Sequence, residues 1–174
     1  MAAPRTVPIA PMHDESQPTS RESVAGILAR CQVSLIADWL TRTKDTAELN
    51  HLQLSDEQRT GHLPKLLEDI VKRLGKLKLP SKDSDAVESL AAVAHGKLRR
   101  TQHYTPAMLI HESRILQVTI FGTLHKNLSL LDFKLLLPDV MVIADEVDAQ
   151  LTQTMESFTN GTTKSAKPHL LRPK

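Results

Sequence analysis

Apolar side chains that recur every three or four residues constrain this 174-residue chain more than any other feature of its sequence. The first run predicts a helix over residues 20–43, with an apolar stripe formed by Val24, Leu28, Cys31, Leu35 and Trp39. Thr19 and Glu22 are spaced as a capping box, in which a hydroxyl and a carboxylate bind free amide groups at a helix start. Order is therefore expected to begin at Thr19.

The same spacing, together with start signals, predicts the remaining helices. Ser55 and Gln58 form a second capping box, and the helix after it carries leucines up to Leu77. Leu63 is an alternative start, because Pro64 fits only a first turn. Further helices are expected over 83–101, 105–124, 129–137 and 138–158. The chain is thus expected to be all-α, a single helical bundle of five to six helices with short connections.

Composition excludes several other classes of protein. Aromatic residues make up 3% of the chain and glycines number six, whereas sheet folds depend on β-branched and aromatic side chains. No stretch reaches the roughly 18 apolar residues of a membrane span. The single cysteine, Cys31, leaves no internal disulfide and no cysteine metal cluster, and it indicates a reducing, cytoplasmic compartment.

Charge and proline content define the expected domain boundaries. The net charge is +2, from 22 Lys and Arg against 20 Asp and Glu, a balance that is not typical of nucleic-acid-binding proteins. Residues 1–18 are proline-rich and do not follow the pattern of a signal peptide, so a disordered leader is expected. The helical domain is expected over 19–160 and a flexible basic tail over 161–174.

The sequence contains none of the common catalytic motifs. It has no glycine-rich phosphate loop, no CxxC, no HExxH and no Gly-x-Ser-x-Gly turn. His111 and Glu112 begin like a zinc-protease helix, but position 115 is Ile rather than His. Cys31 lies on an apolar stripe, where a buried and inert thiol is expected. We therefore expect no enzymatic activity and no cofactor.

His95 lies near the middle of an apolar helix and has two interpretations. One is a haem or metal ligand in a globin-type sensor, and the other is a histidine that hydrogen-bonds within the bundle. The second is favoured, because a porphyrin pocket normally uses more aromatic side chains than this chain contains. The histidines expected near helix ends or in loops are predicted to be solvated: His51, His62, His103 and His125.

Polar residues gather where the helices expected over 83–101 and 105–124 meet. A carboxylate on an apolar stripe needs a partner, so Glu112 is expected to contact Arg99 or His95, which lie one turn apart. This contact could be an inter-helix polar clamp, a ligand pocket or a pH switch in which Glu112 raises the pKa of His95. Gly96 is expected to permit close helix approach. The candidate residues are His95, Arg99, Gln102, Tyr104, Glu112 and Arg114.

Two segments carry a family resemblance. The run HGKLRRTQHY, from His95 to Tyr104, with Leu109, Glu112, Arg114, Ile115 and Leu116 after it, resembles the H-x-x-x-R-x-x-Q-G-[YF]…L-x-x-E-[YF]-x-x-L-R pattern of the RsbRD-type N-terminal sensor domain. The segment HLPKLLEDIVKRL, from His62 to Leu74, is similar to its LPxLLxxIxxxL helix, and Trp39 to its first-helix tryptophan. The resemblance covers about residues 20–158. His103 replaces the family's usual glycine, and Ser113 its usual aromatic residue.

The resemblance implies sensing rather than catalysis. Members of the family precede the output domains of bacterial stressosome co-antagonists and of some soluble histidine kinases. We therefore expect a stand-alone, non-catalytic signalling module, globin-like without haem, which acts in stress response or two-component signalling through a kinase or a stressosome-type partner. The apolar stripe of the last helix is expected to form a homodimer or partner face, with Val140, Ile143, Val147, Leu151 and Met155 as its members.

Overall fold

The computed structural model describes residues 21–76 and 88–163 of the chain, with side chains described up to residue 160. Several expectations lie outside these residues: the leader over 1–18, the Thr19 cap, the helix start over 83–87 and nearly all of the basic tail. Within the described ranges the chain is helical, and its one extended pairing is an isolated bridge between Glu22 and Leu131. The prediction of an all-α fold is confirmed.

The first predicted helix is divided into two. Helix α1 spans Val24–Arg30 and helix α2 spans Gln32–Lys44, with a bend of 72° between them at Cys31. Ser23 caps α1 by accepting a hydrogen bond from the Gly26 amide at 3.1 Å. The bend allows both helices to turn apolar side chains toward one core, since Ile27 and Trp39 are both buried.

The second capping box marks a separate short helix, and the alternative start at Leu63 is correct. Helix α3 spans Ala47–Asn50, and α4 spans Asp56–Thr60 behind the Ser55 and Gln58 box. Helix α5 spans Leu63–Gly75 and has Pro64 in its first turn, where the missing amide hydrogen costs no helical hydrogen bond.

The next two helices begin where local capping chemistry allows. Helix α6 spans Leu90–Thr101 behind a Ser89 cap, and α7 spans Pro106–Lys126 behind a Thr105 cap. His103, in the turn between them, has a φ of 61°, which lies in the left-handed region. Side chains other than glycine adopt this region at an energetic cost.

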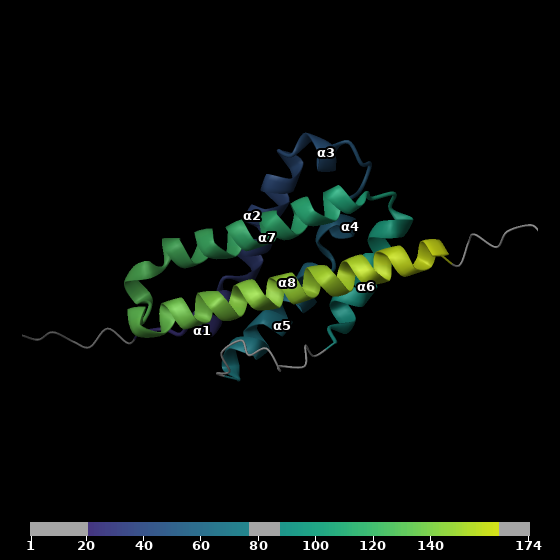
Figure 1. The fold of residues 1–174 in the computed structure, drawn as a ribbon. Helices are drawn as coiled ribbons and strands as arrows, with labels where there is room; N and C mark the ends of the chain where they lie inside the picture. The colour runs from purple at the N-terminus through teal and green to yellow at the C-terminus, as the bar shows by residue number, and fades with distance from the viewer. Residues whose placement is uncertain (1–20, 77–87, 164–174) are drawn as a thin grey trace, which may run out of the picture.

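The last two predicted helices are a single helix. After a 3-10 turn over Leu128–Leu130 (η1), helix α8 spans Phe133–Thr163 and continues through Pro138. Pro138 removes one backbone hydrogen bond near the start of the helix. The 25 residues after it, 139 to 163, continue the helix and its packing. Figure 1 shows α8 crossing the whole bundle and running antiparallel to α7.

The main core lies between α8 and the helices around it. Buried side chains of α1, α2, α5, α7 and α8 form it, and a smaller cluster formed by Leu49, Tyr104, Met108, Leu109 and Phe158 lies toward the end of α8. Ile143 and Val147, predicted on a dimer face, belong to the main core with 0% and 3% exposure. That prediction is wrong for these two residues, because their stripe packs within the chain itself.

The rest of the predicted dimer stripe is also largely used inside the chain. Val140 packs against the main core, Met155 packs against the smaller cluster, and Leu151 lines a small cavity.

Within the described residues, no single helix has the length and apolar character needed to cross a membrane. The bent pair α1 and α2 passes such a test together, by length and composition alone.

Candidate functional site

A buried ion pair between α6 and α7 forms the centre of the candidate site. Arg99 contacts both carboxylate oxygens of Glu112, from Nη2 to Oε1 at 2.8 Å and from Nε to Oε2 at 3.1 Å. Arg99 is 0% exposed and Glu112 is 4% exposed. The Tyr104 hydroxyl donates a third hydrogen bond to Glu112 Oε1 at 2.8 Å. This two-pronged geometry is the strongest form of an Arg and carboxylate contact.

The remaining hydrogens of Arg99 tie α6 to α4. Its guanidinium donates to the carbonyl oxygens of Gln58 and Arg59 at 3.0 and 2.7 Å, and to Gln102 Oε1 at 2.6 Å. Those two carbonyls belong to the last turn of α4, which has no intrahelical donor for them. Arg99 also lies 4.6 Å from the centre of the Tyr104 ring, a cation–π contact. Arg99 thus joins three segments of the chain.

Two histidines lie against this ion pair. His95 Nε2 is 3.4 Å from Glu112 Oε2, and His62 Nδ1 is 3.4 Å from Arg99 Nη2. The two imidazole rings stack, with centroids 3.9 Å apart and planes 13° from parallel. The Trp39 ring meets His62 edge-on at 5.9 Å. The cluster therefore draws residues from α2, from the His62 position before α5, from α6 and from α7.

Burial sets the protonation of the cluster. Desolvation lowers the pKa of His95 despite the nearby Glu112 carboxylate, so the expectation of a raised pKa is wrong. Desolvation, with the charges of His95 and Arg99, lowers the pKa of His62 well below its usual value. Burial alone would raise the pKa of Glu112, but the His95 hydrogen bond and the Arg99 charge outweigh it and hold that pKa low.

Tyr104 stays protonated for a related reason. Burial and the charge of Glu112 both raise the pKa of its phenol. At neutral pH the cluster therefore holds one cation, one carboxylate and three neutral side chains: Arg99, Glu112, His62, His95 and Tyr104. Opposite charges balance in a buried site, as the cost of desolvation requires.

The structure brings five of the six predicted residues together. His95, Arg99, Gln102, Tyr104 and Glu112 all take part in the contacts described above. Arg114 does not, because two residues along a helix correspond to about 200° of rotation. It lies on the exposed side of α7, beside a surface depression that Arg42 and Val118 also line.

Sequence reasoning missed two members of the cluster. His62 was expected in solvent, but its ring lies between Trp39 and His95. Trp39 was assigned to the core only, yet its indole nitrogen also donates to the Glu112 carbonyl oxygen at 3.4 Å. The available signal was the position of His62 one residue before the apolar run of α5, which places its ring against the same interior as Leu63 and Leu66.

The histidines and Glu112 have the composition and the close spacing of a metal site, but their ring orientations differ from those of one. One ligand atom from each of His62, His95 and Glu112 lies within 4.8 Å of the others. A metal ion must lie near the plane of each imidazole that binds it, whereas the two stacked rings have nearly parallel and separate planes. Arg99 already binds both Glu112 oxygens and adds a positive charge. This arrangement does not fit a metal ion shared by the three residues.

Little space for a porphyrin adjoins His95. An internal cavity of about 30 Å³ lies on one side of it, and a surface depression of about 280 Å³ between α5 and α6 lies on the other. Sites for drug-sized ligands measure about 300–1,000 Å³. Apart from His62 and His95, the depression is lined by Gly61, Lys65, Leu90, Ala91, Ala94 and Leu98, none of which is aromatic. Haem ligation by His95 would require α5 and α6 to move apart.

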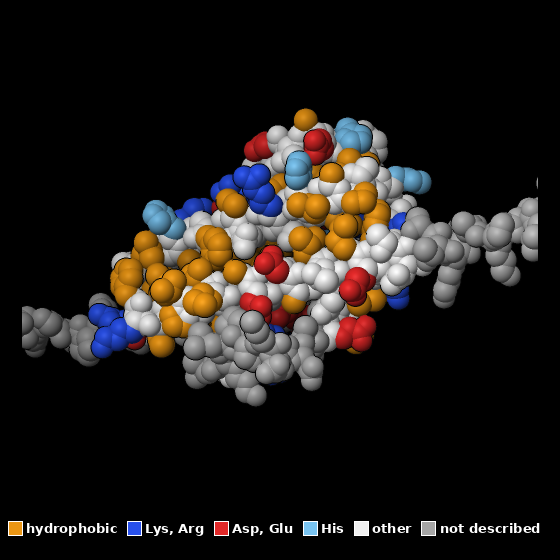
Figure 2. Space-filling view, in the orientation of Figure 1, with side chains coloured by type: hydrophobic (Ala, Val, Ile, Leu, Met, Phe, Trp, Pro, Cys, Tyr) orange, Lys and Arg blue, Asp and Glu red, His pale blue; other side chains and the backbone are white. Residues whose placement is uncertain are grey.

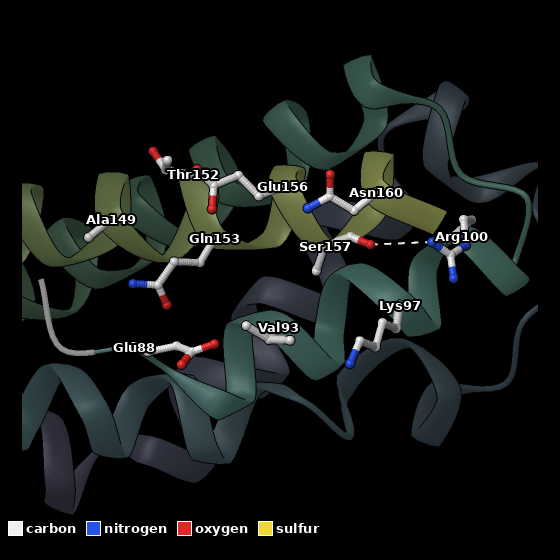
Figure 3. Close-up of a pocket in the computed structure, with 10 residues that line it drawn as sticks. All are labelled: Glu88, Val93, Lys97, Arg100, Ala149, Thr152, Gln153, Glu156, Ser157 and Asn160. Atoms are coloured by element: carbon white, nitrogen blue, oxygen red, sulfur yellow. Dashed lines mark hydrogen bonds between the residues drawn. The ribbon is translucent and has the colours of Figure 1, made fainter. Parts of the chain in front are cut away.

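A groove with a volume of about 850 Å³ lies between α6 and α8. Figure 3 shows Val93, Lys97 and Arg100 on its α6 wall. Arg100 closes one end by donating to the Ser157 and Phe158 carbonyl oxygens, each at 3.3 Å. The described lining contains charges of both signs and neither histidine nor cysteine, so the polar cluster remains the chemically distinctive site.

Comparisons with known proteins matched no family model, no curated protein and no solved structure.

Proposed function

We propose that this chain is a non-catalytic sensory module that acts through protein–protein interaction in bacterial stress or two-component signalling. In this proposal it forms a homodimer in the cytoplasm and passes its state to a kinase or a stressosome-type component. The observation that carries the proposal is an exposed apolar face on α7 and α8, together with a polar cluster whose charged groups are engaged within the chain.

The engagement of the polar cluster argues against a catalytic role. Glu112 accepts hydrogen bonds from Arg99 and Tyr104 and lies beside His95, so its oxygens have no vacant position for a substrate proton. Tyr104 is held protonated by burial and by Glu112. A general base must be within hydrogen-bond reach of a bound substrate. The cluster instead links helices to one another, as an inter-helix polar clamp does.

An apolar face is exposed along neighbouring helices. Phe133, Leu137 and Met141 are spaced by four residues on α8 and are 62%, 69% and 50% exposed. On α7, Ile110 and Val118 are 50% and 45% exposed. Figure 2 shows hydrophobic side chains gathered over this side of the molecule. Exposed apolar side chains grouped on neighbouring helices are typical of an interaction surface.

Charge around this apolar face favours a second copy of the chain as its occupant. Helix α8 has acidic residues at 139, 145, 146, 148 and 156, and no Lys or Arg from Leu135 to Thr163. In Figure 2, Lys and Arg gather above the face, over α2 and α7, and also at the lower left, while Asp and Glu lie below the face along α8 and also at the top of the view. A two-fold axis parallel to α8 would place the basic edge of one copy against the acidic edge of the other.

The backbone at His103 supports the family resemblance on which the signalling role depends. The family pattern has glycine where this chain has His103, and His103 adopts the left-handed φ of 61° that glycine adopts freely. The residues on either side of it, Gln102 and Tyr104, match the glutamine and the aromatic residue of the pattern, and both contact the ion pair. This agreement could not be read from residue identities alone.

Light scattering coupled to size-exclusion chromatography tests the dimer. The chain has a mass of 19.3 kDa, and wild type is expected to elute with twice that mass. Leu137→Glu and Met141→Glu place charges on the apolar face, so each variant is expected to be a monomer with an unchanged circular dichroism spectrum.

The matched control is Val33→Glu on α2, because Val33 is 82% exposed and lies outside the apolar face of α7 and α8. This variant should remain dimeric. A wild-type monomer at high micromolar concentration would overturn the proposal, as would a loss of the dimer in Val33→Glu equal to that in Leu137→Glu.

A further inference from the structure

A small internal cavity lies where α8 passes the polar cluster. Its volume is about 30 Å³, and its lining includes His95 of α6, Ser113 of α7 and Gln150 and Thr154 of α8, together with leucines. His95 is 6% exposed and Gln150 is 4% exposed. The two residues are therefore buried, and the cavity has polar groups on opposite helices.

Two residues of this lining each have a buried polar atom with no hydrogen-bond partner among the described residues: His95 Nδ1 and Gln150 Oε1. Both are acceptors. The Gln150 amide nitrogen donates to the Leu66 carbonyl and to Glu146 Oε1, each at 3.1 Å, which fixes Oε1 as the free atom. The neutral His95 ring directs Nε2 at the Glu112 carboxylate, so Nε2 carries the proton and Nδ1 keeps its lone pair.

We infer that this cavity binds one water molecule, which donates its two hydrogens to His95 Nδ1 and Gln150 Oε1. A site of this size suits it, since one buried water needs about 10–15 Å³ of probe-occupied volume and two to four polar partners. The Ser113 side chain also lines the cavity and supplies a hydroxyl. Leaving a buried polar atom unsatisfied costs about 1–3 kcal/mol, so two such acceptors in one cavity strongly favour a double donor.

Charge excludes an ammonium ion as the preferred occupant. Arg99 places a buried positive charge on the Glu112 carboxylate that His95 contacts, and both Glu112 oxygens already receive hydrogen bonds. An ammonium ion would add a second cation and two more donors than the free acceptors can satisfy. Water is neutral and matches the two free lone pairs.

The water would complete a polar connection across the bundle. On the α8 side, Gln150 leads to Glu146, and Arg73 of α5 lies 3.7 Å from Glu146. On the α6 side, His95 leads through Glu112 to Arg99. With water between His95 and Gln150, a single chain of polar contacts joins α5, α8, α6 and α7 through the interior.

Nuclear magnetic relaxation dispersion of the water signal tests the site, because it counts water molecules that remain buried for longer than nanoseconds. Wild type is expected to hold one such molecule, with water-to-protein nuclear Overhauser effects to the His95 ring and the Gln150 amide protons. Gln150→Leu removes one acceptor at nearly constant volume and is expected to abolish both signals. The control Gln53→Leu, at an exposed loop position, should leave them unchanged.

Two results would overturn the inference. One is a wild-type protein with no long-lived water or no Overhauser effect to His95. The other is a folded Gln150→Leu protein that retains the same long-lived water. The Overhauser measurement needs only wild type, so the inference stays testable even if the Gln150 variant fails to fold.

Discussion

Gly96 of α6 lies against Thr154 of α8 so closely that a β-carbon at position 96 would overlap the Thr154 carbonyl oxygen and Ser157 Oγ. Glycine in a helix interior costs about 1 kcal/mol relative to alanine. The chain accepts that cost because the absent side chain lets the two helices cross. The hydrogen bond from Thr154 Oγ1 to the Ala92 carbonyl, at 3.1 Å, is formed at the same crossing.

Gly96→Ala is therefore expected to destabilise the fold. Overpacking costs about 1–3 kcal/mol, with the larger values where backbone must shift, and this outweighs the gain in helix propensity. Gly122, in the last two turns of α7, is the matched control, because a β-carbon there meets nothing within 4 Å. Gly122→Ala should stabilise by about 0.5–1 kcal/mol. Urea midpoints that move in the same direction for both variants would contradict this account.

Glu112→Ala is expected to destabilise by about 3–5 kcal/mol, because it leaves the fully buried Arg99 guanidinium without its counter-charge. In a cycle of wild type, Arg99→Met, Glu112→Met and the double variant, the double variant should cost less than the sum of its two single changes, by about 1–3 kcal/mol. Denaturant unfolding of the four proteins measures this coupling. Additive effects would mean that the two side chains act independently.

The stability of the fold should fall as the pH is lowered from 7.5 to 5.5. The folded-state pKa values of His62 and His95 lie below the unfolded value of 6.5, so in this window the unfolded chain binds more protons. Stability is present above pH 6.5 and is lost as the pH falls toward the folded values. The loss can reach about 1.4 kcal/mol per pH unit for each histidine.

His62→Phe separates this effect from other titrations, because phenylalanine keeps an aromatic ring between Trp39 and His95 but binds no proton. The variant is expected to lose free energy of unfolding less steeply on acidification. His125→Gln, at an exposed position, is the control and should keep the wild-type slope. A stability that rises as the pH falls from 7.5 to 5.5 would contradict the lowered pKa values.

His103→Gly is expected to stabilise the fold by up to about 1 kcal/mol. The left-handed φ of 61° costs a side chain with a β-carbon about 1–2 kcal/mol, of which the greater flexibility of unfolded glycine cancels part. His103→Ala retains the β-carbon and should bring no gain. Thermal unfolding of the two variants at one pH distinguishes relief of backbone strain from removal of the imidazole.

Signals carried by neighbouring residues predicted several helix starts. Features that depend on packing between distant segments could not be predicted from the sequence. The Thr105 and Leu63 starts depend on neighbouring residues and are confirmed, whereas the Ser55 capping box begins a separate short helix and not the leucine-rich one. The bend at Cys31 was missed, because the apolar spacing continues through it while the two helices turn toward one core. The continuous α8 was missed as well, since a proline near a helix start resembles a first position.

In the candidate site, too, one contact could be predicted from the sequence and another could not. The pairing of Arg99 with Glu112 could be predicted, because a buried carboxylate on an apolar stripe needs a cation one helix away. The stacking of His62 on His95 could not, because it depends on how α5 and α6 approach each other. Ile143 shows the limit of stripe analysis, since a helix surrounded by neighbours buries more than one side.

The isolated bridge at Glu22 ties the start of the described chain to one end of the longest helix. The Glu22 amide donates to the Leu130 carbonyl at 2.7 Å, so the start of the described chain is tied beside the start of α8. Helix α8 then runs for 31 residues, about 46 Å at 1.5 Å per residue. The two ends of the described chain are thus held at opposite ends of a single rod (Figure 1). A rotation or translation of α8 at the Gly96 crossing would therefore displace both ends of the described chain together.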